Sequence, residues 1–300
     1  MSAHQPSLKG QVAVVAGATR GAGRAIAIEL GAAGTTVYCT GRSVRGAPSD
    51  LQRRETIDET AELVTAAGGV GIAVQVDHSQ PEQVEALFQR VAADQDGRLD
   101  ILVNDVWGGE GLMEWKPFWE MDIDKALLMI SRAVFTHIIT SRYGGPLMAA
   151  RNQGLIIEIT DGDTLTYRGN LAYDMAKTAV IRLALAQAED LKARGLDGVT
   201  ALALTPGFLR SEQMLDHFGV TAETWRDAIA QDPYFAGSET PHYIGRAVVA
   251  LATDPNVHTK AGQAWATWTL SDEYDFTDLD GSRPHWGRFF AKMQEKQGNG

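Results

Sequence analysis

The sequence predicts an α/β fold, in which one doubly wound parallel sheet carries helices on both faces. Three observations lead to this prediction. Short, continuous apolar runs alternate with longer segments of helical character, a pattern typical of parallel sheets that are covered on both faces. A glycine-rich turn at residues 17–23 directly follows the first apolar run. No linker, internal repeat or low-complexity tract interrupts the 300 residues, so we expect a single domain over 1–300.

Seven segments are predicted to be strands, because they are short and rich in β-branched or other apolar residues. In chain order they are 11–16, 36–40, 71–76, 99–104, 155–160, 199–204 and 264–269. The predicted helices between and after them are 24–34, 55–67, 80–95, 122–140, 171–193 and 240–252. Gly34 ends the first helix, and Pro81 lies in the first turn of the third. This order predicts a Rossmann fold.

The longest connections lie where a ligand would bind. Segments 108–122 and 209–238 follow strand ends, the edge at which open α/β sheets bind ligands, so we read them as walls or a lid of a substrate site. Simple surface loops are the alternative. Large aromatic residues in and beside these segments are candidates for an apolar pocket wall or for the core: Trp107, Trp115, Phe118, Trp119, Phe208 and Trp225. Segment 42–54 is predicted to be an exposed loop.

Composition excludes several classes of function. The formal net charge of −11 argues against binding to nucleic acid or to an anionic membrane surface, since both require basic patches. No apolar run approaches the ~20 residues that span a bilayer. A single cysteine, Cys39, and the lack of an apolar signal core in the first ten residues favour a cytoplasmic protein. The seven histidines form no His-Glu-x-x-His pattern, so no catalytic metal is expected.

The glycine-rich turn, which also contains Thr19, predicts a dinucleotide site. Gly17 permits a tight turn off the first strand, while Gly21 and Gly23 let backbone and helix approach a pyrophosphate without a Cβ in the way. The helix that begins there offers free N–H groups and the positive end of its dipole to the phosphates. Because the turn follows a strand and opens a helix, its context supports this interpretation.

The second strand suggests which cofactor is preferred. An acidic residue at its end would bind a ribose 2′-hydroxyl and repel a 2′-phosphate, but this strand leads into Gly41 and Arg42. Arg42 can pair with a 2′-phosphate, and Arg20 in the glycine turn could lie on its other side. We therefore expect NADP(H) in preference to NAD(H).

Two further polar residues close strands. Asp77, after the third strand, could accept a hydrogen bond from the adenine amino group; alternatively it is a helix N-terminal acid ahead of Pro81. Asn104, which closes the fourth strand, could tie neighbouring strands together and face the adenosine ribose.

Tyr173 and Lys177 stand four residues apart, so a helix would present a phenol and an ammonium on one face. With this pair, the motifs resemble those of the short-chain dehydrogenases/reductases over nearly all of the chain. Residues 17–23 resemble the family's TGxxxGxG, residues 104–107 its NNAG with only the first Asn kept, and residues 173–177 its YxxxK. Pro206-Gly207 followed by Ser211 resembles the segment that contacts the nicotinamide side. The ending, 274–284, is most similar to the member 1 subgroup of this family.

The resemblance implies a mechanism of hydride transfer between a carbonyl and an alcohol. Tyr173 would be the acid that protonates the carbonyl oxygen, and the base in the reverse direction. Its ordinary pKa, about 10, is too high for a base at neutral pH. Lys177 would stabilise the phenolate, lower that pKa and hold the nicotinamide ribose. The family also implies a homodimer or homotetramer assembled through the helices 122–140 and 171–193.

One position departs from the family. Where the family has a Ser that donates a hydrogen bond to the substrate oxygen, this chain has Thr160-Asp161, and either residue can be aligned with that Ser. Thr160 can donate as Ser does. An ionised Asp161 would repel the developing oxyanion and raise the Tyr173 pKa, whereas a protonated Asp161 could donate. Asp161 could also bind an amine or a hydroxylated substrate.

The sequence thus favours an NADP(H)-dependent oxidoreductase acting on a small-molecule carbonyl or alcohol. Two alternatives stay open. The first is a non-catalytic or regulatory NADP-binding protein that kept the fold. The second is a variant chemistry that uses Asp161, such as imine reduction or dehydration. The identity of the substrate leaves no sign that can be interpreted in the sequence.

Overall fold

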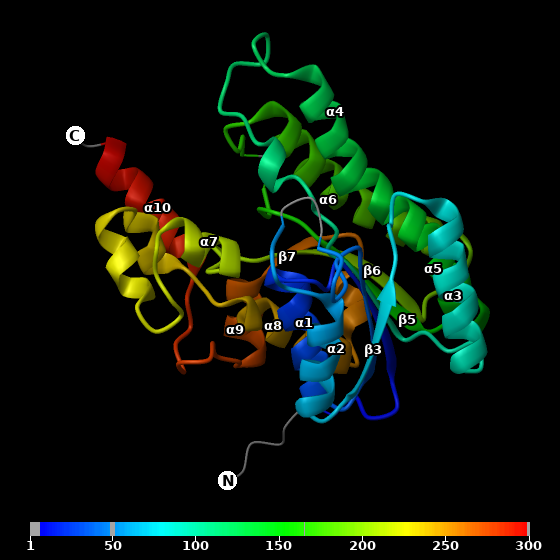
Figure 1. Ribbon diagram of the computed structural model, residues 1–300. Helices are drawn as coiled ribbons and strands as arrows, with labels where there is room; N and C mark the ends of the chain where they lie inside the picture. Colours follow the sequence, from blue (N-terminus) through cyan, green and yellow to red (C-terminus); the bar gives the residue numbers. More distant parts are fainter. Residues whose placement is uncertain (1–6, 49–51, 165, 299–300) are drawn as a thin grey trace.

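A seven-stranded parallel sheet forms the centre of the computed structural model, which describes residues 7–48, 52–164 and 166–298 (Figure 1). The strand order is β3-β2-β1-β4-β5-β6-β7, so the chain winds outward in both directions from β1. The strands are β1 (Val12–Ala16), β2 (Thr36–Gly41), β3 (Val70–Gln75), β4 (Ile101–Asn104), β5 (Gly154–Ile159), β6 (Val199–Thr205) and β7 (Ala264–Ala266). The predicted doubly wound fold is confirmed.

Helices cover both faces of the sheet. Those belonging to the central α/β units are α1 (Gly21–Ala32), α2 (Ile57–Ala66), α3 (Pro81–Asp94), α4 (Ile123–Ile130), α5 (Thr136–Arg151), α6 (Leu171–Ala193) and α8 (Pro241–Thr253). One core cluster joins α1, α2 and α8 to residues such as Val15 and Val103. The opposite cluster joins α3 and α5 to neighbouring residues such as Val14 and Leu102. Alternate strand residues therefore bury against opposite helix layers, as a parallel sheet requires.

The remaining helical segments connect the units of the sheet or follow its last strand. They are α7 (Glu212–His217), α9 (Thr267–Tyr274) and α10 (Trp286–Gly298), with the short turns η1 (Glu110–Leu112), η3 (Trp225–Ala230), η4 (Pro233–Gly237) and η5 (Val257–Lys260). Figure 1 shows α10, in red, beside the yellow segment that includes η3 and η4, away from the sheet. No helix in the described residues combines the length and the apolar character needed to cross a membrane.

Three predicted boundaries differ by three residues or more. The first helix begins at Gly21, three residues before its predicted start. The helix predicted at 122–140 continues through a π-helical turn, η2 (Ser131–Phe135), and α5 to Arg151. Gly144 does not end it, because this glycine lets α5 pack closely: a Cβ there would lie 2.9 Å from Phe88 and Leu102 atoms. The strand predicted at 264–269 stops at Ala266, and the buried Thr267 begins α9 with its hydroxyl donating to Glu239.

The prediction that segment 42–54 is an exposed loop can be compared with the structure only in part. Residues 49–51 lie outside the described residues, and so do residues 1–6 at the start of the chain. Within the described part, Arg45 to Pro48 are exposed, as expected of a loop, but Ser43 is buried.

Candidate active site

A pocket of about 550 Å³ opens beyond the carboxyl ends of β1, β4, β5 and β6. All of the predicted site residues line it except Gly23 and Asn104. Gly17 and Ser211, which stand 194 positions apart in the sequence, both line it, because the loops after parallel strands lie at one edge of the sheet. The topology thus assembles the predicted site.

The glycine turn has the geometry of a cradle. Gly17 has a φ of +91°, and a Cβ on it would lie 2.6 Å from the carbonyl oxygen of Asp105. A Cβ on Gly23 would lie 2.4 Å from the carbonyl oxygen of Gly17, so both positions require glycine. Gly21 has a φ of +57° and faces open space, with the nearest atom 3.9 Å from a Cβ position. Gly23 therefore packs against the backbone of the turn, while Gly21 lines the pocket.

The N-terminus of α1 already holds an anionic group. The backbone N–H of Gly21 donates to the carboxylate of Glu212 at 2.9 Å, from the first turn of α7. A carboxylate at this point occupies the kind of position that a phosphate oxygen takes at a helix N-terminus. Beside it, Nη1 of Arg20 is buried and has no hydrogen-bond partner among the described residues. The residues present therefore fit an anionic dinucleotide.

The far end of the pocket contains Arg42, Ser43 and Asp77. Asp77 Oδ1 accepts two hydrogen bonds from Ser79, at 2.9 Å from its N–H and 2.7 Å from its hydroxyl. Although burial raises the pKa of Asp77, these hydrogen bonds lower it overall. Asp77 therefore shapes the turn before α3, where Gln80 and not Asp77 is the N-cap, and it also borders the pocket.

Asn104 does not face the pocket. Its side chain is fully buried, and Nδ2 donates to Ser141 at 2.8 Å and to Glu158 at 2.9 Å. The expectation that it faces the adenosine ribose is wrong, because these bonds turn it towards β5 and α5; it ties neighbouring strands instead. Glu158 in turn binds His137, which bonds the carbonyl of Val106 at 3.1 Å. This buried network supports the strand end from which Asp105 and Trp107 enter the site.

At the other end of the pocket, Asp161 and Tyr173 are joined directly. The Tyr173 hydroxyl donates to Asp161 Oδ2 at 2.6 Å. Thr160 is buried, and its hydroxyl donates to the carbonyl of Lys177 at 2.7 Å. The chain turns immediately afterwards at Gly162, where φ is +79°. The two adjacent residues therefore differ in function: Thr160 anchors α6, and Asp161 faces the phenol.

The electrostatics around Tyr173 and Lys177 are unusual for the expected mechanism. Burial, followed by the negative charge of Asp161, raises the pKa of Tyr173 well above its ordinary value. Burial lowers the pKa of Lys177, although Asp161, Asp105 and Glu110 oppose that effect. Without a ligand, the phenol is thus held neutral, the opposite of the activation that the family pattern implies.

Trp107 completes this end of the site. Its ring lies 4.4 Å from Nζ of Lys177 and meets Tyr173 edge-on, with 5.3 Å between the ring centroids. A Cβ on Gly109 would lie 2.4 Å from the Trp107 ring, so glycine at 109 makes room for it. The indole therefore holds Lys177 by a cation–π contact.

Asp105 was not among the predicted site residues. It replaces the second Asn of the family's NNAG, and it accepts a hydrogen bond from the N–H of Gly23. Burial raises its pKa to about 7, against the lowering influence of Lys177 and His137. The altered NNAG motif was the available signal.

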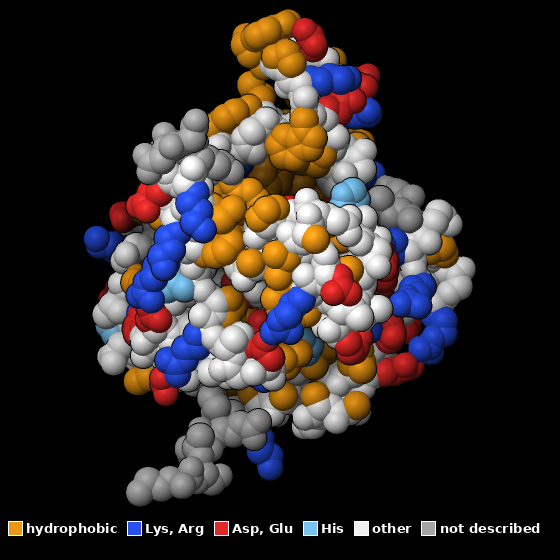
Figure 2. Space-filling view, turned by 90° about the vertical axis from the view of Figure 1, so that its left-hand side faces the viewer, with side chains coloured by type: hydrophobic (Ala, Val, Ile, Leu, Met, Phe, Trp, Pro, Cys, Tyr) orange, Lys and Arg blue, Asp and Glu red, His pale blue; other side chains and the backbone are white. Residues whose placement is uncertain are grey.

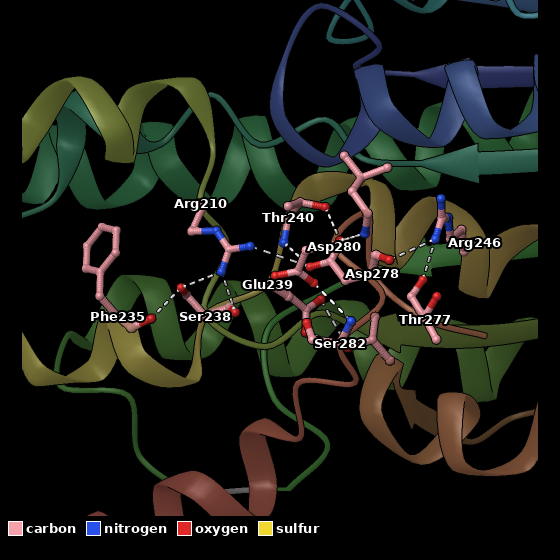
Figure 3. A network of polar contacts seen from close by, with 12 residues as sticks. Arg210, Phe235, Ser238, Glu239, Thr240, Arg246, Thr277, Asp278, Asp280 and Ser282 are labelled. Atoms are coloured by element: carbon pink, nitrogen blue, oxygen red, sulfur yellow. Dashed lines mark hydrogen bonds and ion pairs between the residues drawn. The ribbon is translucent and has the colours of Figure 1, made fainter. Parts of the chain in front are cut away.

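A buried network fixes the wall that follows β6 (Figure 3). The backbone N–H of Glu239 donates to the carbonyl oxygen of Phe208 at 2.9 Å. The backbone N–H of Arg210 donates to the carbonyl oxygen of Glu239, also at 2.9 Å. The Arg210 guanidinium donates to Ser238 at 2.7 Å and lies 3.6 Å from Asp278. Burial raises the pKa of Glu239 to about 8. Segments 206–210, 238–240 and 275–284 are thereby held as one unit.

Trp286, which the sequence did not single out, belongs to this wall. It stacks on Phe208 with 5.9 Å between the ring centroids and an interplanar angle of 26°, and both rings line the pocket. A Cβ on Gly207 would lie 2.7 Å from Trp286 Cβ. Ser211 also borders the pocket, where its hydroxyl accepts from the N–H of Met214 and caps α7.

Four of the six predicted aromatic residues lie outside the pocket lining. Trp115, Phe118 and Trp119 are 70%, 61% and 70% exposed. Figure 2 shows hydrophobic side chains at the upper end of the molecule, where Figure 1 draws the segment before α4. Trp225 packs against the guanidinium of Arg210 at 4.0 Å. The prediction of a pocket wall from these four residues is wrong, whereas Trp107 and Phe208 do line the pocket.

Comparison with known proteins agrees with this geometry. The family model described as short chain dehydrogenase matches residues 11–218. Dehydrogenase/reductase SDR family member 1 from mouse is 35% identical over 279 residues, which cover 91% of this chain and 85% of that protein. The human protein of the same name is 34% identical over the same shares.

Solved structures share the fold. A short-chain dehydrogenase from Mycobacterium thermoresistibile aligns with a TM-score of 0.77 and 22% identity, covering 94% of this chain and 93% of that one. A putative NAD(P)-dependent gluconate 5-dehydrogenase from Beutenbergia cavernae, solved with bound NADP, aligns with a TM-score of 0.67 and 26% identity, covering 87% and 96%.

Proposed function

The chain belongs to the short-chain dehydrogenase/reductase family, and from this premise we propose that it interconverts a carbonyl and an alcohol by hydride transfer with NADP(H). The observation that carries the proposal is the meeting of Tyr173 and Lys177 with the glycine turn in one pocket. A bound nicotinamide nucleotide would supply or accept the hydride.

The cofactor would lie along the pocket from the glycine turn to Lys177. Gly17, Thr19 and Gly21 would hold the diphosphate at the N-terminus of α1. Arg20 and Arg42 support a preference for NADP(H) over NAD(H), because guanidinium groups pair with phosphate in two hydrogen bonds. Asp77 borders the far end, and the nicotinamide side would meet the segment that holds Pro206, Gly207 and Ser211.

Tyr173 would move the proton. In the reducing direction its hydroxyl gives a proton to the substrate oxygen, and in the oxidising direction the phenolate takes one back. Lys177 would favour the phenolate and hold the nicotinamide ribose. We assign the place of the family's Ser to Asp161, since the Thr160 hydroxyl is already bonded to the carbonyl of Lys177.

The test combines turnover with cofactor binding. NADPH oxidation is followed over a panel of ketones and aldehydes for the wild type and for Tyr173→Phe, and NADPH affinity is titrated for both. We expect the variant to lose turnover and to keep its affinity. Equal turnover in both proteins would refute the role of Tyr173, whereas saturable NADPH binding without any turnover would favour a binding or regulatory role.

Asp161→Ser separates ordinary carbonyl chemistry from a variant chemistry. If the carboxylate only obstructs an ordinary ketone, restoring the family's Ser should raise turnover. If Asp161→Ser instead lost the activity of the wild type, the reaction would depend on Asp161. Imine reduction or dehydration that uses this residue would give that result. The contact of 2.6 Å between Asp161 and Tyr173 makes this second outcome worth testing.

We further propose a cytoplasmic homodimer or homotetramer. Several large apolar side chains are exposed on α4, the adjoining turn, α5 and α6, the same helices through which the family resemblance implies assembly. They are Ile123, Leu127, Leu128, Phe135, Ile138, Leu171 and Met175. The single cysteine, Cys39, is buried and unpaired, which suits a reducing compartment.

A further inference from the structure

Asp161 puts a carboxylate beside the reacting position, where ketone reduction needs a neutral or positive donor. An ionised carboxylate accepts hydrogen bonds only, and it opposes negative charge on a substrate oxygen. The side chain is 43% exposed and lines the pocket, so a ligand can reach it. Resting on the hydride-transfer function proposed above, we infer that the substrate is a carbonyl compound, or the matching alcohol, that carries a protonated amine one or two carbons away, and that Asp161 binds this ammonium group.

The protein itself leaves the charge of Asp161 incompletely compensated. The nearest cation, Arg168, has its Nε 3.9 Å from Oδ2, beyond hydrogen-bond distance. The guanidinium donates instead to Asp174 at 3.1 Å and to the carbonyl of Thr164 at 2.8 Å. The pocket side of Asp161 is therefore open to a second cation.

Lys177 does not fill that need. Its Nζ lies over the Trp107 ring, and three carboxyl groups act on this one ammonium: Asp161, Asp105 and Glu110. Glu110 also borders the pocket, and its Oε2 is buried without a hydrogen-bond partner among the described residues. This end of the pocket thus contains more acidic than basic groups, and Glu110 Oε2 is an acceptor with no donor among the described residues.

The aromatic part of the pocket lining suits an organic cation. Phe208 and Trp286 stack on each other and line the pocket, and the network of Figure 3 fixes the segment that carries Phe208. Aromatic faces attract alkylammonium groups, and their area accommodates the apolar part of the same molecule. A pocket lined by a carboxylate and by aromatic faces can hold a substrate that has both a positive nitrogen and apolar carbon.

Such a substrate would offset the negative charge that Asp161 places beside the substrate oxygen. An ammonium bound to Asp161 neutralises the carboxylate, so the Tyr173 hydroxyl is released to the substrate oxygen. The ammonium N–H can then donate to that oxygen in place of the family's Ser. In the reduction, the carbonyl carbon receives a hydride from the reduced nicotinamide nucleotide, the C=O π pair moves to oxygen, and oxygen takes the proton of Tyr173. The ammonium is unchanged, and Tyr173 regains a proton from solvent after the alcohol leaves.

Two nearly isosteric ketones test the inference. 2-Amino-1-phenylethanone and 1-phenylpropan-1-one differ by an ammonium in place of a methyl group. For the wild type we expect kcat/KM to favour the amino ketone by about 10- to 100-fold, the size of a charge-assisted hydrogen bond. Asp161→Ser should lower kcat/KM for the amino ketone and raise it for the plain ketone. Asp161→Asn, which keeps the shape of the side chain, should abolish the preference.

A binding measurement distinguishes failure of the inference from failure of the hydride-transfer function. The product 2-amino-1-phenylethanol is titrated into the protein with NADP⁺, using tryptophan fluorescence or calorimetry. We expect affinity that falls above the pKa of the amine in the wild type and is lost in Asp161→Ser. Equal kcat/KM for both ketones, with binding that ignores Asp161, would overturn the inference and leave the proposed function standing. If no carbonyl turned over, the hydride-transfer function and the substrate assigned from it would both be overturned. Asp161-dependent binding would then support only the ammonium site at Asp161, and Asp161-independent binding would overturn that site as well.

Discussion

Removing the Glu212 carboxylate should tighten NADPH binding. Glu212 accepts from the Gly21 N–H at 2.9 Å, at the helix end where we propose that the diphosphate binds. A cofactor phosphate must displace this contact and then lie beside a carboxylate. Hydrogen bonds to a charged group contribute about 1.5–3 kcal/mol, and partial exposure of Glu212 puts the cost near the lower end.

Taking about 1–2 kcal/mol for the displaced contact, we expect Glu212→Ala to bind NADPH about 5- to 30-fold more tightly. The NADPH affinity of Glu212→Gln should lie between those of the wild type and Glu212→Ala, because its amide oxygen can still accept from the Gly21 N–H but carries no charge. The assay is a titration of NADPH fluorescence at fixed ionic strength.

Asp216→Asn is the matched control, because it removes one negative charge from the same helix, where Asp216 binds Arg53 at 2.8 Å. Its affinity should change little. An unchanged or weaker affinity in Glu212→Ala, or an equal gain in Asp216→Asn, would refute the idea that Glu212 competes for the phosphate position.

Three further predictions follow from the site and the helix surface. Arg42→Ala and Arg20→Ala should each weaken NADPH binding about tenfold and leave NADH binding nearly unchanged, as measured by parallel titrations. The pKa of Asp105 is about 7 in the folded protein and about 4 in the unfolded chain, so its deprotonation destabilises the wild type as pH rises from about 4 to 7. Asp105→Asn lacks this proton, so the difference in melting temperature between variant and wild type should shift in favour of the variant over that range. Glu239, with a pKa of about 8, leaves a similar slope in both proteins. Phe135→Glu, on the exposed face of the turn after α4, should yield a smaller species in light scattering.

The local patterns were sufficient for the fold and for most of the pocket. Strand, turn and helix at residues 11–32 follow from short-range rules, because an apolar run and closely spaced glycines permit few alternatives. Parallel topology then brings strand ends together, so residues after β1, β5 and β6 could be expected in one site without any knowledge of their contacts.

Contacts between distant segments could not be predicted. Gly21 and Glu212 are 191 positions apart, and no periodicity signals their hydrogen bond. Trp286 stacks on Phe208 in the pocket wall, and the contact of Asp278 with Arg210 joins the C-terminal segment to the loop after β6. The exposed Trp115 shows the converse, since an aromatic residue in a long loop has the same appearance in sequence whether it lines a pocket or faces solvent.

The choice between Thr160 and Asp161 depended on one turn, and it changes how the chemistry must be read. Spacing alone allowed either residue to replace the Ser; the turn at Gly162 and the bond from Thr160 to Lys177 leave Asp161 facing the phenol. Burial, followed by the charge of the carboxylate to which its hydroxyl donates, raises the pKa of Tyr173, so this acid would be weakest while the site is empty. A cation bound at Asp161 would offset the part of this effect that comes from the carboxylate charge, and it would free the hydroxyl for the substrate oxygen. The substitution would then act as a selector: substrates that bring a positive charge would activate Tyr173, and neutral ketones would leave it bound to Asp161.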